Sequence, residues 1–340
     1  MDLTMIKSNK HPLTFAILGC GVAATIHADA INQLEGAALK GVFDPNISSR
    51  ETFSKKYNIT PYNTFDELLN DGEVDIVCVC TPSFLHAENA IDILNSGKHA
   101  VVEKPMAMSS DDADAIIKAS HDNGKLVTVI SQIRFSPDVE RIKKLLSENA
   151  FGKISLCSLS MNYYRTPEYY SGSNWRGSLT LDGGTLMNQG IHGIDLIEYI
   201  LGPVKDVKGK TATLVHNIEA PDTAVAIVEF ESGVLGVIES STCAYPGFSR
   251  RLKIQGDKGY VVLKENNIEK LMLGGEKIID RVNSEQIVKT AKDPTKILCG
   301  LHLLQLQNFV GAIRGDEPLL VDGIEGRKAV KMIEKIYSNT

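Results

Sequence analysis

Cysteine is scarce in this chain, and no two cysteines form a C-x-x-C motif. Only six of the 340 residues are cysteines, and no spacing of Cys and His matches a zinc site or a disulfide framework. Cys78 and Cys80 stand in one apolar run and are expected to be small core residues on one face of a strand. We therefore expect no metal site and no disulfides, a pattern typical of a reducing cytoplasm.

Long apolar runs and basic clusters are also missing. No stretch approaches the length of a membrane span, and the first residues lack the apolar segment of a signal peptide. The formal net charge is −6, which argues against nucleic acid or an anionic membrane as a partner. We expect a cytoplasmic protein that acts on small molecules.

The first strong pattern is an apolar run, Thr14–Leu18, followed by G-C-G-V-A-A at residues 19–24. Gly19 permits a tight turn after a buried strand, and Gly21 lets the backbone approach a pyrophosphate without a Cβ in the way. The helix that follows would direct its N-terminal N–H groups at the phosphates. This pattern predicts a dinucleotide-binding loop with contacts from Gly19, Gly21, Val22 and Ala23.

A second apolar run, residues 38–43, ends at Asp44. A carboxylate at this point of such a fold can accept hydrogen bonds from both ribose hydroxyls of NAD. It would repel a 2′-phosphate, and the next basic residue is Arg50. The sequence therefore favours NAD over NADP as the cofactor.

The chain divides into two parts that differ in their pattern of expected strands and helices. From residue 12 to 131, apolar runs alternate with amphipathic segments, which is typical of a Rossmann-type, doubly wound parallel sheet. The expected strands are Thr14–Leu18, Ala38–Phe43, Val74–Cys80, Ala100–Glu103 and Leu126–Ile130, with helices over Ala23–Leu34, Glu88–Asn95 and Ser109–Asn123. We expect this segment to be the NAD-binding domain.

From residue 132 to 340, strands predominate and few helices separate them. The expected strands are Ile154–Tyr163, Lys205–Val215, Asp222–Phe230, Gly233–Ser241, Arg250–Gln255 and Gly259–Leu263, with helices over Pro137–Ser147, Gly184–Leu201 and from Leu301. This predicts an α/β domain with a large, mostly antiparallel open sheet, which would bind substrate and mediate self-association as a dimer or tetramer.

A charged pair closes the fourth expected strand of the first domain. Glu103, Lys104 and Pro105 follow an apolar run and are placed at the rim of the nucleotide crevice. A lysine there could stabilise a developing alkoxide, and partial burial would let it pass a proton. The alternative is a solvated lysine that pairs with Glu103.

A second candidate group lies in L-D-G-G-T-L-M-N-Q-G-I-H-G-I-D, residues 181–195. On a continuous helix, Asn188, His192 and Asp195 would share one face and could hold a substrate that carries hydroxyl groups. His192 would then be the general base that deprotonates the alcohol. The alternative is a core histidine held by Asp195, and the tandem glycines together with the Asn and His spacing favour the functional interpretation.

Four motifs in this order resemble the Gfo/Idh/MocA oxidoreductase family: G-C-G-V-A-A at residues 19–24, T-P-S-F-L-H at 81–86, E-K-P at 103–105 and G-G-T-L-M-N-Q-G-I-H at 183–192. The resemblance spans the chain and implies that Lys104 and His192 are the catalytic pair. It places Thr81, Pro82 and His86 along the nicotinamide and Glu103 near its ribose, and Lys104 and Gln132 are further candidate cofactor contacts. Many relatives carry aspartate where this chain has Asn188, which leaves Asn188 a hydrogen-bonding role.

A loop rich in aromatic residues, residues 163–176, precedes the His192 segment. Trp175 can stack on the apolar face of a sugar, while Arg165 and Arg176 can bind a carboxylate or phosphate. Tyr164 is one of four tyrosines here that could donate to hydroxyl groups. The loop resembles the family branch that oxidises the 3-hydroxyl of glucose-type rings, including UDP-N-acetylglucosaminuronate 3-dehydrogenases, and its expected substrate contacts are Tyr164, Arg165, Trp175, Arg176, Asn188 and Asp195.

These observations predict an NAD-dependent enzyme that oxidises a ring hydroxyl, at C3, of a glucose-type sugar, glycoside or nucleotide sugar. His192 would take the hydroxyl proton while Lys104 stabilises the oxyanion. The alternatives are a glycoside hydrolase that works by oxidation and elimination with retained NAD, an inositol dehydrogenase, and a non-catalytic NAD or sugar sensor. A metal enzyme that uses His86, His192 and Asp195 matches no standard ligand spacing.

Overall fold

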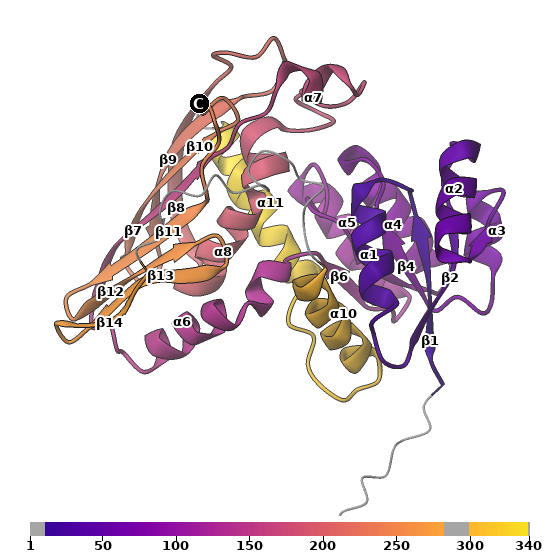
Figure 1. The fold of residues 1–340 in the computed structure, drawn as a ribbon, viewed down its shortest axis with the longest axis horizontal. Coiled ribbons are helices and arrows are strands. Elements are labelled where there is room, and N and C mark those ends of the chain that lie inside the picture. The colour runs from indigo at the N-terminus through magenta and orange to yellow at the C-terminus, as the bar shows by residue number, and fades with distance from the viewer. Residues whose placement is uncertain (1–10, 282–298, 339–340) are drawn as a thin grey trace, which may run out of the picture.

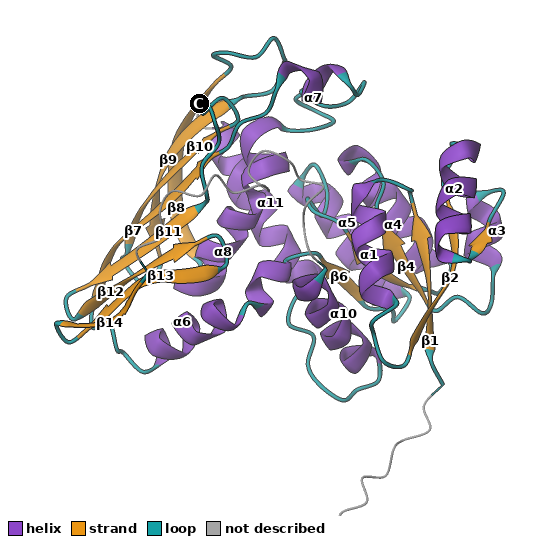
Figure 2. Ribbon diagram, viewed as in Figure 1, coloured by secondary structure: helices purple, strands orange, loops and turns teal. Residues whose placement is uncertain are grey.

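The computed structural model describes residues 11–281 and 299–338. Two sheets stand at opposite sides of the molecule, and helices from both parts of the chain fill the space between them (Figures 1 and 2). The described residues confirm the expected fold class, a parallel sheet followed by a larger and mostly antiparallel one.

The first sheet is parallel throughout and has the strand order β3-β2-β1-β4-β5-β6. Its strands are β1 Leu13–Leu18, β2 Ala37–Phe43, β3 Thr60–Pro61, β4 Ile76–Val79, β5 His99–Val102 and β6 Val127–Val129. The central strands are short apolar runs covered on both faces, which is what a doubly wound sheet requires. The sequence analysis did not predict β3, which has only two residues, both exposed.

Helices cover both faces of this sheet (Figure 2). They are α1 Val22–Ile31, α2 Ile47–Tyr57, α3 Phe65–Asn70, α4 His86–Asn95 and α5 Ser110–Asp122. The side chain of Ser109 accepts a hydrogen bond from the backbone N–H of Asp112, which caps α5 as the sequence predicted. Helices α2 and α3 were not predicted, since neither combines its cap with a strong apolar stripe.

The second sheet has the order β14-β13-β12-β11-β7-β10-β9-β8, and only the β7–β10 pair is parallel. Its strands are β7 Ile154–Asn162, β8 Val204–Ala212, β9 Thr223–Phe230, β10 Leu235–Ser241, β11 Arg251–Gly256, β12 Gly259–Lys264, β13 Asn267–Leu273 and β14 Glu276–Asp280. The last two strands are an extension that the sequence analysis did not predict. Their turn residues and charges interrupt the apolar alternation.

The helices of the second part are α6 Pro137–Ser147, α7 Pro167–Ser171, α8 Ile191–Leu201, α10 Gly300–Ile313 and α11 Gly323–Ser338. Helices α6, α8 and α11 contact this sheet, whereas α10 packs against α1 of the first part (Figure 1). The predicted helix over residues 184–201 is interrupted, because Thr185–Gly190 forms a π-helical segment before α8 begins. This change of period rotates Asn188 relative to the residues of α8.

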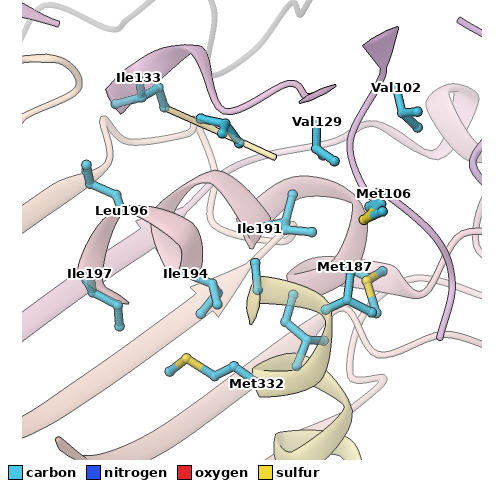
Figure 3. Close-up of a cluster of buried hydrophobic side chains, with 14 of the residues drawn as sticks. Val102, Met106, Val129, Ile133, Met187, Ile191, Ile194, Leu196, Ile197 and Met332 are labelled. Atoms are coloured by element: carbon cyan, nitrogen blue, oxygen red, sulfur yellow. The ribbon is translucent and has the colours of Figure 1, made fainter. Parts of the chain in front are cut away.

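A shared apolar core joins the two parts below the candidate site. Val102 and Val129 of the parallel sheet belong to one apolar cluster with Ile191 and Ile194 of α8 and Met332 of α11 (Figure 3). The chain also returns to the first part, since Leu306 and Phe309 of α10 pack in one core with Phe15 and Ile17 of β1. The division at residues 131 and 132 remains a proposal, and α10 crosses back over it.

Candidate active site

The glycine-rich loop leaves an open cradle at the start of α1. No side chain caps the first turn of α1, and a Cβ built on Gly21 would meet no atom within 4 Å. Gly19 has φ +97°, and a Cβ there would lie 2.7 Å from the carbonyl oxygen of Cys80. The free N–H groups and the open space suit a pyrophosphate, so Gly21, Val22 and Ala23 fit the cofactor contact expected of them.

Asp44 lies against the glycine-rich loop. It follows β2, and its Oδ2 accepts a hydrogen bond from the backbone N–H of Cys20 at 2.8 Å. Its Oδ1 accepts another from the N–H of Asn46 at 2.8 Å. The carboxylate is therefore held against the glycine-rich loop by two amides, and its remaining acceptor capacity suits two hydroxyl groups.

His86 contacts the two turns that are expected to lie along the nicotinamide. This residue is 1 % exposed, and its Nδ1 lies 2.6 Å from the carbonyl oxygen of Pro105. Its Nε2 lies 2.9 Å from the carbonyl oxygen of Thr81. The histidine therefore bridges the Thr81–Pro82 turn and the Lys104–Pro105 turn, which makes it a positioning residue. Gln132 lies beside this region in the short helix 132–135, and its buried Oε1 has no partner among the described residues.

Glu103 takes part in a buried ion pair. Its Oε1 lies 2.9 Å from Nε2 of His27 on α1, and its Oε2 accepts from the backbone N–H of Lys104 at 3.2 Å. Burial would raise the pKa of Glu103, but His27 outweighs it and holds that pKa well below its usual range. The ring of His302 meets that of His27 edge-on at 5.8 Å. Glu103 is thus a fixed anion whose charge His27 balances.

Lys104 extends from the end of β5 toward α8. Its Nζ donates one hydrogen bond, to the main-chain oxygen of Asn188 at 2.9 Å. Burial lowers the pKa of Lys104, while the charges of Glu103 and Asp182 act in the opposite direction. An ammonium group has three donors, so two remain for a substrate oxygen, since the described residues offer Nζ no other acceptor.

His192 is the second residue of α8, and no hydrogen bond joins its ring to any described residue. Burial, followed by the charges of Lys104 and Arg250, lowers its pKa well below the usual value, so the ring is neutral at pH 7. A Cβ on the next residue, Gly193, would lie 2.4 Å from the sulfur of Met161, so glycine lets α8 pack on β7 without a shift of that side chain.

Asn188 is fully engaged rather than open to solvent. Its Nδ2 donates to Oδ1 of Asp182, and its Oδ1 accepts from Nε2 of Gln189 at 3.2 Å. Asp182 is 2 % exposed and comes from the turn that precedes the π-helical segment. Only the main chain of Asn188 contacts Lys104.

Asp195 and His192 are three residues apart on α8 and share a face of it, whereas Asn188 lies in the π-helical segment before α8. Both carboxylate oxygens of Asp195 bond to the guanidinium group of Arg134, at 3.0 and 2.6 Å. The buried Arg134 occupies both oxygens of this carboxylate and thereby holds α8 in place. The substrate contact expected of Asp195 from the sequence stays a prediction.

The aromatic loop supplies two kinds of residue. Arg165 is 6 % exposed and donates to the carbonyl oxygen of Tyr164 and to Oε1 of Gln189. It therefore supports the loop from within. Arg176 and Trp175 are only half-buried, and the guanidinium group of Arg176 lies 4.3 Å from the ring centre of Tyr169. Tyr164 packs edge-on against Tyr245 at 5.2 Å. Of the expected substrate contacts in this loop, Tyr164, Trp175 and Arg176 are half-buried and keep exposed surface for a ligand.

Sequence reasoning missed Asp182, Arg250, His27 and His302, all of which act on the charges of this site. Their neighbours come from distant segments, and Asp182 alone carried a local signal, its place beside the tandem glycines. One group of possible metal ligands occurs in the described ranges, His216, Asp222 and Cys243. Asp222 already accepts hydrogen bonds from the N–H groups of residues 214, 215 and 216, so we assign it to shaping that turn.

The cradle at α1, the carboxylate after β2 and the lysine and histidine between the sheets define an NAD-binding oxidoreductase. Family comparisons agree. Residues 13–131 match the NAD-binding Rossmann fold of the Gfo/Idh/MocA oxidoreductase family, and residues 143–339 match its C-terminal alpha/beta domain. The chain belongs to this family.

Several relatives act on sugars or cyclic polyols. The WlbA dehydrogenase of Bordetella pertussis, solved with NADH and UDP-GlcNAcA, is 30% identical, covers 97% of this chain and 96% of its own, and superposes with a TM-score of 0.87. Myo-inositol 2-dehydrogenase of Thermotoga maritima is 24% identical over 94% of this chain and 93% of its own length. Glucose-6-phosphate 3-dehydrogenase of Bacillus subtilis is 24% identical over 95% and 96%.

Helices long and apolar enough to cross a membrane are absent from the described part of the chain.

Proposed function

We propose that this protein oxidises the C3 hydroxyl of a glucose-type sugar or nucleotide sugar, with NAD as the oxidant. The observation that carries the proposal is the pairing of Lys104 and His192. Among the described residues, Nζ of Lys104 makes a single hydrogen bond and the ring of His192 makes none, while the groups around them are hydrogen-bonded. The charge of Lys104 acts on the pKa of His192, so the two groups lie within electrostatic reach of one another.

The two side chains have complementary tasks. The neutral ring of His192 has a nitrogen lone pair that can take the hydroxyl proton. The ammonium group of Lys104 can donate to the same oxygen, and this interaction strengthens as negative charge develops. Bound NAD supplies the hydride acceptor. Asn188 contributes its main-chain oxygen, which fixes the direction of the lysine.

A sugar as substrate follows from the loop and from the relatives. Trp175 offers an aromatic face and Arg176 a cation, a combination suited to a pyranose that carries an acidic group. WlbA was solved with such a nucleotide sugar, and the Bacillus relative is named for oxidation at position 3. We assign Trp175 and Arg176 to substrate and Arg165 to support of the loop.

The test is a spectrum of the purified protein with NAD⁺ before and after addition of UDP-GlcNAcA, glucose 6-phosphate, free glucosides and inositols. We expect NADH absorbance to rise with one substrate class and to be lost in Lys104→Met, which keeps the length of the side chain without its charge. Lys118→Met, at an exposed position of α5, is the matched control.

Other outcomes separate the alternatives. Release of free sugar without net NADH would indicate oxidation and elimination, and a rise with inositols alone would move the substrate to cyclic polyols. No rise with any compound, despite bound NAD⁺, would contradict the proposed oxidation and favour a sensor.

We also propose that the protein is a homo-oligomer that associates through the open face of the second sheet. Exposed apolar residues lie side by side there, since Leu235 pairs with Leu156 and Val237 pairs with Ile227. A sheet face of this kind is suited to a symmetric contact with a second copy. Ile227→Glu should lower the mass measured by light scattering, whereas Lys118→Glu, at an exposed position of α5 away from this sheet, should not.

A further inference from the structure

A polarised chain of hydrogen bonds links the aromatic loop to the catalytic segment. Arg165 donates to Oε1 of Gln189 at 2.5 Å. Nε2 of Gln189 donates to Oδ1 of Asn188 at 3.2 Å and to the hydroxyl of Tyr169 at 2.9 Å. Nδ2 of Asn188 then donates to Asp182. Since an arginine can only donate and a carboxylate can only accept, the two ends fix the orientation of both amides.

Asp182 closes this chain as a buried anion. Its Oδ2 accepts from the backbone N–H of Gly177 at 3.1 Å, and the residue is 2 % exposed. Burial raises the pKa of Asp182, while Asn188, backbone N–H groups and the charge of Lys104 oppose that rise. A carboxylate at this depth requires a nearby positive charge to remain ionised, and Lys104 supplies it.

The other charges around Lys104 single out Asp182. Glu103 adjoins the lysine, but its carboxylate is paired with His27. Arg165 acts against the protonation of Lys104, and His192 and His86 respond to its charge. Once Glu103 and His27 are counted as a balanced pair, Asp182 is the anion left to face the ammonium group.

We propose that Asp182 is a positioning residue that serves as the counter-ion of Lys104 and, through Asn188, directs its ammonium group toward the substrate oxygen. The connection runs from the carboxylate to the side chain of Asn188, and from the main-chain oxygen of Asn188 to Nζ of Lys104. Arg165 and Tyr169 tie the same chain to the loop that would cover the sugar. The role in catalysis rests on the proposed function, whereas the electrostatic interaction between Asp182 and Lys104 does not.

The first test replaces the charge and keeps the shape. In Asp182→Asn, Lys104 should react with an amine-specific reagent at a pH about one unit lower than in the wild type, because an opposite charge favours the ammonium form by about 1–3 pKa units. The extent of labelling is read by peptide mass spectrometry at saturating NAD⁺, with the exposed Lys118 as internal reference. Asp257→Asn, on a surface turn, is the matched control. An unchanged labelling curve would overturn the proposal.

A second measurement tests the proposal if Asp182→Asn folds poorly. If the two residues form an ion pair, the loss of melting temperature in the double variant Asp182→Asn with Lys104→Met is smaller than the sum of the two single losses. Additive losses would overturn the pairing. Neither readout needs turnover, so absence of sugar oxidation would defeat the proposed function alone. If turnover is found, the alkaline limb of the kcat profile should move to lower pH in Asp182→Asn.

Discussion

Asp195 accepts two hydrogen bonds from the guanidinium group of Arg134, from Nε at 3.0 Å and from Nη2 at 2.6 Å. A third bond joins Nη1 of Arg134 to Oε2 of Glu325 at 2.8 Å. The arginine is 2 % exposed and Asp195 6 %, so the group is buried. These bonds connect α8 to α11 and to the segment that follows the parallel sheet. The point of attachment on α8 is three residues after His192.

This arrangement predicts that Asp195 contributes to stability rather than to substrate affinity. Removal of one partner from a buried ion pair costs about 3–5 kcal/mol because the other charge is left uncompensated. Glu325 still holds Arg134, so we expect Asp195→Ala to lower the free energy of unfolding by about 3 kcal/mol. Urea denaturation measures this change, and Asp206→Ala, at an exposed position of β8, is the control. A tenfold rise of KM with unchanged stability would instead place Asp195 on the substrate.

The pair also shows where sequence reasoning ends. The sequence predicted one helix over residues 184–201, and its part from 191 to 201 is α-helical. The change to π-helical geometry at 185–190 has no signal in the apolar spacing. It interrupts the continuous helix that was expected to bring Asn188 onto one face with His192 and Asp195.

The features that could be predicted from the sequence are those that depend on residues close together in the chain. The parallel strands were found because short apolar runs between helices are a local signal, whereas β13 and β14 gain their stability from pairing with β12. Lys104 and His192 lie in recognisable motifs. Asp182 becomes the counter-charge of Lys104 only because residues 78 positions apart in the chain meet in the fold.

Asp44 should control the choice between NAD and NADP. Replacement by alanine removes the acceptor for the ribose hydroxyls and the negative charge that would repel a 2′-phosphate. We expect KM for NAD to rise about 10- to 100-fold, as charge-assisted hydrogen bonds contribute about 1.5–3 kcal/mol, and KM for NADP to fall. Asp44→Asn keeps an acceptor for the N–H of Cys20 and separates cofactor contact from loop support. Unchanged KM values in both variants would contradict the assignment.

The pair of Glu103 and His27 should make stability depend on pH in the alkaline range. Burial would lower the pKa of His27, but Cys78 and Glu103 raise it from 6.5 to about 10. The protonated form is therefore favoured in the folded state, and its contribution is complete below pH 6.5 and lost as the pH rises to about 10.

We therefore expect the free energy of unfolding to fall by about 2–4 kcal/mol more in the wild type than in His27→Gln between these limits. Glutamine can still donate to Glu103 but cannot titrate. Denaturation in urea across this range gives the difference between the two proteins, and parallel curves would show that His27 is neutral in the fold.

His192 should set the acid limb of activity. Burial and the charge of Lys104 lower its pKa below 6.5, so the neutral base persists to a lower pH than an exposed histidine would allow. The profile of kcat/KM should consequently stay level at pH 6.5 and fall only below it. His192→Gln should reduce kcat by about 10²- to 10⁴-fold, the usual contribution of general base catalysis, with NAD affinity unchanged in fluorescence titration. His121→Gln, at the exposed end of α5, should leave both properties unchanged. If His192→Gln retained full turnover, or if the acid limb lay above 6.5, another group would be taking the proton.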